Sequence, residues 1–157
     1  MQYKIKVLFV CLGNICRSPM AEFIFRDMVN KRGLSDCFSI ASAATSREEL
    51  GNPVYPPARR ILKAHGIDCM GKTARQITKA DYQEYDYLLA AETYNIRNMM
   101  RIIGSDPDKK VYRLLDFSNS PRDIADPWYT GDFQITWDDI VEGCEGFLKY
   151  LEKEGRI

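Results

Sequence analysis

The sequence predicts a single domain of the α/β class, in which helices cover both faces of a parallel sheet in three layers. Strand-like apolar segments alternate with amphipathic helical segments, and such alternation is typical of parallel strands joined by right-handed crossovers. The chain has 157 residues, of which 45% are hydrophobic and 28% charged, as in an ordinary globular domain. No internal repeat is found, so we expect one domain over residues 1–157.

The composition argues against several classes of protein. Lysine plus arginine and aspartate plus glutamate balance at 22 each, which leaves no basic footprint for nucleic acid. No apolar run has the length of a membrane helix, so we expect no membrane insertion. The first residues lead directly into strand-like sequence, which gives no sign of a signal peptide. The five cysteines lack paired C-x2-C spacing, and we expect free thiols, a cytoplasmic location and no bound metal or cofactor.

The first strand and helix are the most clearly marked elements. Residues 5–10 form an apolar run that predicts a buried strand. Residues 20–31 predict an amphipathic helix, with Ser18 as its N-cap, Pro19 at its first position and Gly33 after its end. We expect Met20, Ile24 and neighbouring apolar residues on one face of this helix and Glu22 on the other.

The other elements follow in alternation. A long loop over 116–131 is rich in proline and aromatic residues, a composition that favours a functional role over disorder. The last helix is expected to begin at a capping box in Thr136–Asp139. Strands are expected over 38–44, 87–91 and 110–115, and helices over 58–64 after Pro56 and Pro57, briefly from Thr78, over 96–103 and near the C-terminus.

The turn Cys11–Pro19 between the first strand and helix predicts a site for a phosphate-like dianion. In open α/β sheets, ligands bind at the carboxyl ends of the strands. A helix N-terminus directs N–H groups and partial positive charge at an anion. Gly13 and Asn14 tolerate the dihedral angles of a tight anion-binding loop. Arg17 offers a planar guanidinium that binds two phosphate oxygens at once.

The same setting makes Cys11 a candidate nucleophile. A helix N-terminus and a nearby cation favour the thiolate, the form of cysteine that attacks phosphorus. In the alternative interpretation, Cys11 is a small core residue and Arg17 a surface charge. A nucleotide-binding loop is disfavoured, because the sequence lacks the Gly-x4-Gly-Lys-Ser/Thr pattern.

A thiolate that attacks phosphorus also needs a general acid for the leaving group. Asp126 is the candidate, because Pro127 restricts it to extended geometry and so holds its carboxylate away from the loop. From composition alone, the alternative is that Asp126 is an ordinary solvated aspartate in a turn. Asp123 is the local competitor, but no proline or aromatic residue directly follows it.

These residues resemble the low-molecular-weight protein tyrosine phosphatase family. The resemblance rests on VLFVCLGNICRSPMAE near the N-terminus and extends through Ser42–Ser46, Gly51–Pro53 and Asp126–Tyr129. It implies a flavodoxin-like sheet with strand order 2-1-3-4. It also implies a metal-independent hydrolase that acts on tyrosine-phosphorylated proteins or peptides, is inhibited by phosphate and other oxyanions, and is a monomer.

The resemblance also implies roles for individual residues. Cys11 forms a phosphocysteine, Arg17 holds the phosphate, and Asp126 serves as general acid and then general base. Cys16 can close a disulfide with Cys11 after oxidation, although it is otherwise simple loop filler. The phosphate loop consists of Cys11 and Arg17 together with Leu12, Gly13, Asn14, Ile15, Cys16 and Ser18.

His65 has two interpretations. Taken alone, a single histidine at a helix end is more often a cap or a core residue than a catalyst. The resemblance implies that His65 joins Ser42, Asn14 and Ser18 in a buried hydrogen-bond network that shapes the phosphate loop.

Substrate selectivity is expected to come from a pocket lined by Leu12, Glu48, Trp128 and Tyr129. Its depth favours phosphotyrosine over phosphoserine, whose short side chain does not reach the loop. Many family members have an aromatic residue at position 48, where this chain has an acid, and Tyr or Phe at position 128. Members that act on phosphoarginine carry threonine where this chain has Ile15, and the bulkier Ile15 favours tyrosine.

Two rival classes share parts of this pattern. Arsenate reductases have a similar loop and fold but relay electrons through closely spaced cysteines, whereas Cys37, Cys69 and Cys144 are scattered. A non-catalytic phosphate-binding module is disfavoured, because Cys11, Arg17 and Asp126 are all present.

Overall fold

The computed structural model describes residues 3–157 and has a four-stranded parallel sheet in the predicted order β2-β1-β3-β4. Its strands are β1 (Ile5–Cys11), β2 (Phe38–Ala44), β3 (Tyr87–Ala90) and β4 (Val111–Arg113). The central strand β1 pairs with β2 and β3, in a register that sets Cys11 opposite Ala44 and Val10 opposite Ala90. The carboxyl ends of three strands therefore meet at one edge of the sheet.

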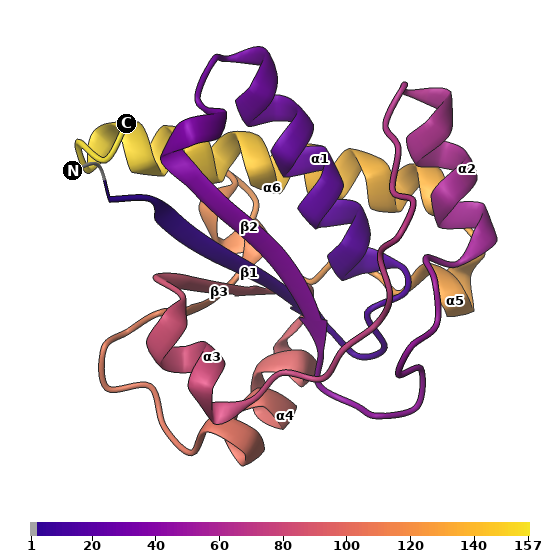
Figure 1. Cartoon of the computed structure of the whole chain (residues 1–157), viewed down its shortest axis with the longest axis horizontal. Helices are drawn as coiled ribbons and strands as arrows, with labels where there is room; N and C mark the ends of the chain where they lie inside the picture. The colour runs from indigo at the N-terminus through magenta and orange to yellow at the C-terminus, as the bar shows by residue number, and fades with distance from the viewer. Residues whose placement is uncertain (1–2) are drawn as a thin grey trace.

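Helices cover both faces of this sheet, as the alternating pattern predicts (Figure 1). Helices α1, α2 and α6 lie on one face, and α3 and α4 lie on the other. The helices are α1 (Arg17–Lys31), α2 (Pro56–Ala64), α3 (Lys79–Glu84), α4 (Thr93–Ile103), α5 (Pro127–Thr130) and α6 (Phe133–Lys153), with short 3-10 turns η1 (Ser35–Cys37) and η2 (Leu114–Phe117).

The side chains of β1 alternate between two apolar cores, because successive residues of a strand point to opposite faces. Val7 and Phe9 pack among α1 and α6, whereas Leu8 and Val10 pack toward Tyr82 of α3 and Met99 of α4. Cys11 ends the first of these rows, so its side chain lies on the α1 side of the sheet edge.

Helix α1 begins earlier than the sequence predicts, and this changes the role of Ser18. The helix starts at Arg17 after Cys16, so Ser18 lies inside the first turn instead of capping it. Its hydroxyl contacts the Cys11 thiol and therefore does not serve as a cap. Glu22 was expected on the polar face, but it is buried against the end of β2, where it accepts a hydrogen bond from Ser42.

The beginning of α6 also differs from the prediction. Asp132 is the N-cap, and its Oδ1 atom accepts a hydrogen bond from the Ile135 N–H at 3.0 Å. Thr136 is buried inside the first turn, so the predicted capping box at this residue is wrong. Within the described residues, none of the helices combines the length and apolar character needed to span a bilayer.

Two glycines of α6 allow this helix to approach the segment after β4 closely. A Cβ atom at Gly143 would lie 2.6 Å from the Leu114 Cγ atom, and one at Gly146 would overlap the Phe117 carbonyl oxygen. The turn η2 therefore rests directly on α6, and the chain continues from η2 through Ile124 to Asp126.

We expect Gly146→Ala to lower the free energy of unfolding by about 2 kcal/mol, because overpacking against a backbone oxygen outweighs the intrinsic helix preference of alanine. Urea denaturation measures the change. Glu145→Ala is the matched control at the adjacent exposed position of the helix, and it should stay within about 0.5 kcal/mol of wild type. Equal stability of the two variants would contradict the close approach of α6 and η2.

Candidate active site

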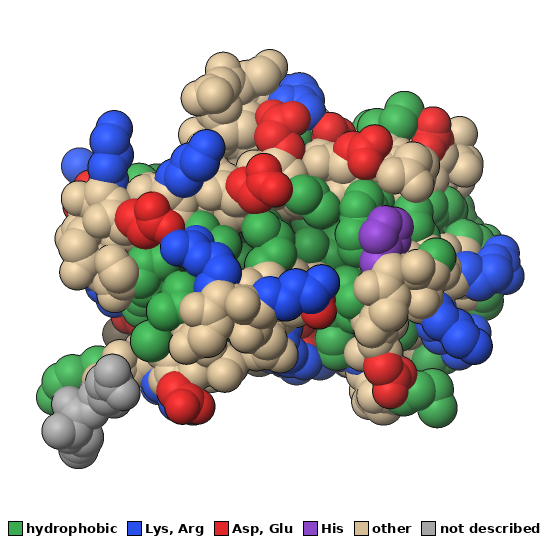
Figure 2. All heavy atoms as spheres, turned by 90° about the horizontal axis from the view of Figure 1, so that it is seen from above, with side chains coloured by type: hydrophobic (Ala, Val, Ile, Leu, Met, Phe, Trp, Pro, Cys, Tyr) green, Lys and Arg blue, Asp and Glu red, His purple; other side chains and the backbone are tan. Residues whose placement is uncertain are grey.

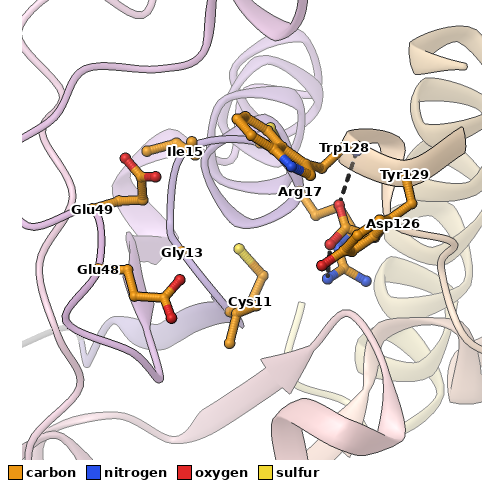
Figure 3. A pocket seen from close by; sticks show the side chains of 11 residues that line it. Cys11, Gly13, Ile15, Arg17, Glu48, Glu49, Asp126, Trp128 and Tyr129 are labelled. Atoms are coloured by element: carbon orange, nitrogen blue, oxygen red, sulfur yellow. Dashed lines mark hydrogen bonds and ion pairs between the residues drawn. The ribbon is translucent and has the colours of Figure 1, made fainter. Parts of the chain in front are cut away.

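A pocket opens at the sheet edge where β1, β2 and β3 end (Figure 3). The phosphate loop forms its floor, the segment after β2 one wall, and the start of α5 the opposite wall. Its lining brings together residues from three distant parts of the sequence: Cys11, Leu12, Gly13, Ile15, Cys16, Arg17, Glu48, Glu49, Asp126, Trp128 and Tyr129.

The Cys11 sulfur is surrounded by hydrogen-bond donors. The Ser18 hydroxyl lies 3.0 Å from Sγ, and the backbone N–H groups of Asn14 and Ser18 point at Sγ over 3.3 and 3.4 Å. The second N–H belongs to the first turn of α1, whose dipole favours negative charge at this position. This arrangement suits a bound anion at the helix N-terminus.

Asn14 holds the phosphate loop in shape. Its φ of 59° is left-handed, a conformation that asparagine tolerates better than most residues. Its side-chain amide donates to the hydroxyls of Ser18 at 2.7 Å and Ser42 at 3.0 Å, and its Oδ1 atom accepts the Arg75 N–H at 3.2 Å. Of the two candidates named from the sequence, Asn14 adopts the positive φ and Gly13 does not.

The network continues under the loop through charged residues and not through His65. Ser42 donates to the Glu22 carboxylate at 2.6 Å. The Lys72 ammonium lies 3.4 Å from the same carboxylate and donates to the Ser42 carbonyl at 3.0 Å. Burial lowers the pKa of Lys72, and the charge of Glu22 opposes that shift.

The expectation that His65 belongs to this network is wrong. Its ring lies at the surface at the C-terminal end of α2, where Figure 2 shows it in purple. Nδ1 contacts the Ile61 carbonyl at 3.0 Å, and the ring stacks on Trp137 with 3.7 Å between centroids. The His65 imidazole therefore contacts α2 and α6. Under the loop, Lys72 and not His65 contacts Ser42.

Arg17 is held from several sides. Its side chain is only 3% exposed, forms an ion pair with Glu92, and donates to the Ile124 carbonyl at 2.8 Å. Burial by itself would lower the pKa of Arg17, but the surrounding negative groups raise it above its ordinary value. The guanidinium is thus a permanent cation with a fixed orientation at the pocket floor.

Asp126 lies beside Arg17 at the mouth of the pocket. Its Oδ2 atom is 3.4 Å from Arg17 Nη2, and its Oδ1 atom accepts the Trp128 N–H at 3.0 Å as the N-cap of α5. The competitor Asp123 faces elsewhere: it accepts hydrogen bonds from the Thr93 N–H and the Arg113 guanidinium, which help to lower its pKa although burial opposes the shift. Of the two, only Asp126 lines the pocket that contains Cys11.

An aromatic wall completes the pocket. Trp128 packs on Tyr55, with ring centroids 4.9 Å apart, and Tyr55 in turn stacks on Phe133. Tyr129 is 82% exposed, so its ring is free to meet a ligand that enters the pocket. The four pocket residues named from the sequence, Leu12, Glu48, Trp128 and Tyr129, therefore lie together around Cys11.

Three residues that matter to this geometry were not identified from the sequence: Glu22, Lys72 and Glu92. Glu92 follows the end of β3 by two residues, and its place at the carboxyl edge of the sheet was a usable signal. Neither Glu22 nor Lys72 gave a signal in the sequence, because charged residues on an amphipathic helix or in a loop are ordinarily solvated.

We expect Lys72→Met to lower the free energy of unfolding by about 2 kcal/mol, because it removes one of the two cations beside the buried Glu22 carboxylate and leaves only Arg26, 2.9 Å from it. Chemical denaturation checks this value. Lys31→Met, at an exposed surface pair, should change stability by less than about 1 kcal/mol. The double variant Glu22→Gln/Lys72→Met should recover part of the loss, and no recovery would contradict a direct interaction of the pair.

Cys16 should resist alkylation. Burial, reinforced by the negative charge of Cys11, raises the pKa of the Cys16 thiol to about 12. Because alkylation needs the thiolate, few molecules are reactive at pH 8, and burial, the larger cause of the raised pKa, remains when Cys11 is replaced. In a Cys11→Ser background, we expect iodoacetamide to modify the half-buried Cys37 far faster than Cys16, as measured by peptide mass spectrometry. Equal rates would contradict the environment described for Cys16.

Comparison with known proteins identifies the family. The model of the family described as low molecular weight phosphotyrosine protein phosphatase matches residues 6–157. The chain is 40% identical to the low molecular weight protein-tyrosine-phosphatase YfkJ of Bacillus subtilis, over 98% of this chain and 99% of that protein. It is also 40% identical to the human low molecular weight phosphotyrosine protein phosphatase, over 91% and 93%.

Solved structures agree with this assignment. The crystal structure of YfkJ superposes with a TM-score of 0.91 at 41% identity and covers 96% of both chains. The Drosophila arginine phosphatase superposes with a TM-score of 0.84 at 31% identity, over 93% of this chain and 97% of that one. The chain belongs to the low molecular weight phosphotyrosine protein phosphatase family.

Proposed function

We propose that this protein is a protein tyrosine phosphatase that hydrolyses phosphotyrosine in proteins and peptides, and small aryl phosphates, through a phosphocysteine. One observation carries the proposal: a donor-surrounded cysteine sulfur, a fixed guanidinium and a carboxylate share one pocket at a helix N-terminus. Each of the three groups supplies a part that phosphoryl transfer requires.

In the first step, the phosphate enters the loop and is held by Arg17 and the backbone N–H groups. Cys11 Sγ attacks phosphorus in line, so that an S–P bond forms while the P–O bond to the tyrosine breaks. Asp126 gives its proton to the departing phenolate oxygen. The loop donors and Arg17 stabilise the charge on the equatorial oxygens throughout.

In the second step, the Asp126 carboxylate takes a proton from water, which attacks the phosphocysteine. The S–P bond breaks, Cys11 leaves as a thiolate, and inorganic phosphate is released. The Ser18 hydroxyl, 3.0 Å from Sγ, donates to the departing sulfur and makes it a better leaving group.

The pocket wall favours an aromatic substrate. Leu12, Trp128 and Tyr129 offer apolar surface above the loop, and the depth selects a long side chain over phosphoserine. Ile15 lines the pocket beside Cys11, which supports tyrosine over phosphoarginine, although one similar solved structure is named an arginine phosphatase.

Several further properties belong to the same proposal. The protein acts as a cytoplasmic monomer without a metal ion, and phosphate and other oxyanions compete for its loop. When a peroxide oxidises Cys11 to a sulfenic acid, the Cys16 thiol condenses with it to a disulfide and releases water.

The test is hydrolysis of para-nitrophenyl phosphate in the presence of EDTA. Wild type should turn over and Cys11→Ser should not. Asp126→Ala should lose about 10²–10⁴-fold in kcat, as expected for a general acid. Asp123→Ala is the matched control and should keep most of the activity, because its carboxylate binds Thr93 and Arg113 outside the pocket.

Three other outcomes would count against the proposal. Binding of phosphate by wild type without turnover would indicate a binding module, and arsenate-dependent thiol oxidation would indicate a reductase. Turnover of phosphoarginine peptides faster than phosphotyrosine peptides would reject the assigned substrate class.

A further inference from the structure

We propose that Glu48 makes this phosphatase select substrates that carry lysine or arginine next to the phosphotyrosine. This inference rests on the function proposed above and adds the class of peptide that the proposed reaction would prefer. It concerns the rim of the pocket, which the chemistry at the floor does not use.

The Glu48 carboxylate lies free at the pocket wall. Figure 3 shows it directed from the segment after β2 toward the space above Cys11. Within residues 3–157 it takes part in none of the hydrogen bonds and ion pairs found, whereas its neighbour Glu49 accepts a hydrogen bond from Asn52 at 2.6 Å. An unpaired charge that faces a binding pocket is available to the ligand.

The described pocket lining contains no free lysine or arginine. Arg17 is the one lysine or arginine that lines the described pocket, and it is 3% exposed and paired with Glu92 and Asp126. The carboxylates of Glu48 and Glu49 line the rim above it. The whole chain is balanced at 22 charges of each sign, so this acidity is a local property of the pocket mouth.

The opposite wall suits the same kind of group. Trp128 and Tyr129 are 54% and 82% exposed, and their rings face the pocket across from Glu48. An ammonium or guanidinium group is attracted to the face of an aromatic ring as well as to a carboxylate. A cationic residue beside the phosphotyrosine is therefore attracted to the aromatic rings and to the Glu48 carboxylate, whereas an acidic residue is repelled by Glu48.

This charge pattern acts on selectivity more than on the chemical step. Like charges at an interface disfavour a wrong partner, and opposite charges accelerate encounter. An exposed ion pair changes a binding equilibrium by about fivefold or less. Replacing an attractive flank by a repulsive one should therefore change kcat/KM by about three- to tenfold.

The experiment compares three phosphotyrosine peptides of one sequence, with lysine, glutamine or glutamate on both sides of the phosphotyrosine. Each is assayed with wild type, Glu48→Gln and Glu48→Lys at low ionic strength, and the lysine-to-glutamate ratio of kcat/KM is the readout. The ratio within one variant cancels any change in its general activity. Glu145→Gln, an exposed glutamate on α6, is the matched control.

We expect a ratio of about three to ten for wild type and Glu145→Gln, a smaller ratio for Glu48→Gln, and a ratio below one for Glu48→Lys. The wild-type ratio should fall as salt is added. A wild-type ratio near one, or a ratio that Glu48→Gln leaves unchanged, overturns the inference.

Para-nitrophenyl phosphate is assayed in parallel with wild type to separate two kinds of failure. Turnover of this substrate together with equal rates on the three peptides refutes the role of Glu48 alone. No turnover of it by wild type refutes the proposed function and the inference with it.

Discussion

The side-chain amide of Asn14 ties the phosphate loop to the first turn of α1 through Ser18 and to the end of β2 through Ser42. The left-handed backbone at Asn14 turns its own N–H toward the Cys11 sulfur. The loop is also held from outside by its carbonyls, because those of Cys11, Leu12 and Ile15 accept the N–H groups of Thr45, Ser46 and Tyr55. The N–H groups that point at the sulfur have no carbonyl partner of their own, so the Asn14 side chain supports that part of the loop from beneath.

Charge around the loop is arranged by burial. Arg17 is fixed by Glu92 and the Ile124 carbonyl before any ligand arrives, so binding needs little reorganisation of this side chain. Beneath the loop, the pairing of Lys72 with Glu22 places a second cation out of the substrate's reach. The floor of the pocket is therefore positive, while its rim is acidic and aromatic.

The sequence predicts the strands and the position of the phosphate loop because both depend on local patterns, whereas the order of the strands in the sheet followed from the family resemblance. Strand 38–44 is predicted at its observed bounds, since β-compatible residues and the turn before it are local signals. Helix starts are less predictable: Ser18 and Thr136 are good caps by type, yet tertiary contacts use Ser18 for Cys11 and bury Thr136. The network under the loop joins residues 14, 22, 42 and 72, and no local pattern states that such distant residues meet.

The close contact of α6 with η2 has a consequence for the order in which the two sides of the pocket form during synthesis. Cys11 and its loop emerge early from the ribosome, but the segment that leads to Asp126 rests on a helix that ends at Lys153. Phe147 of that helix also packs on Phe25 of α1, with ring centroids 5.6 Å apart. A nascent chain therefore contains Cys11 well before Asp126 can take its place, because the segment before Asp126 is supported only when α6 has left the exit tunnel.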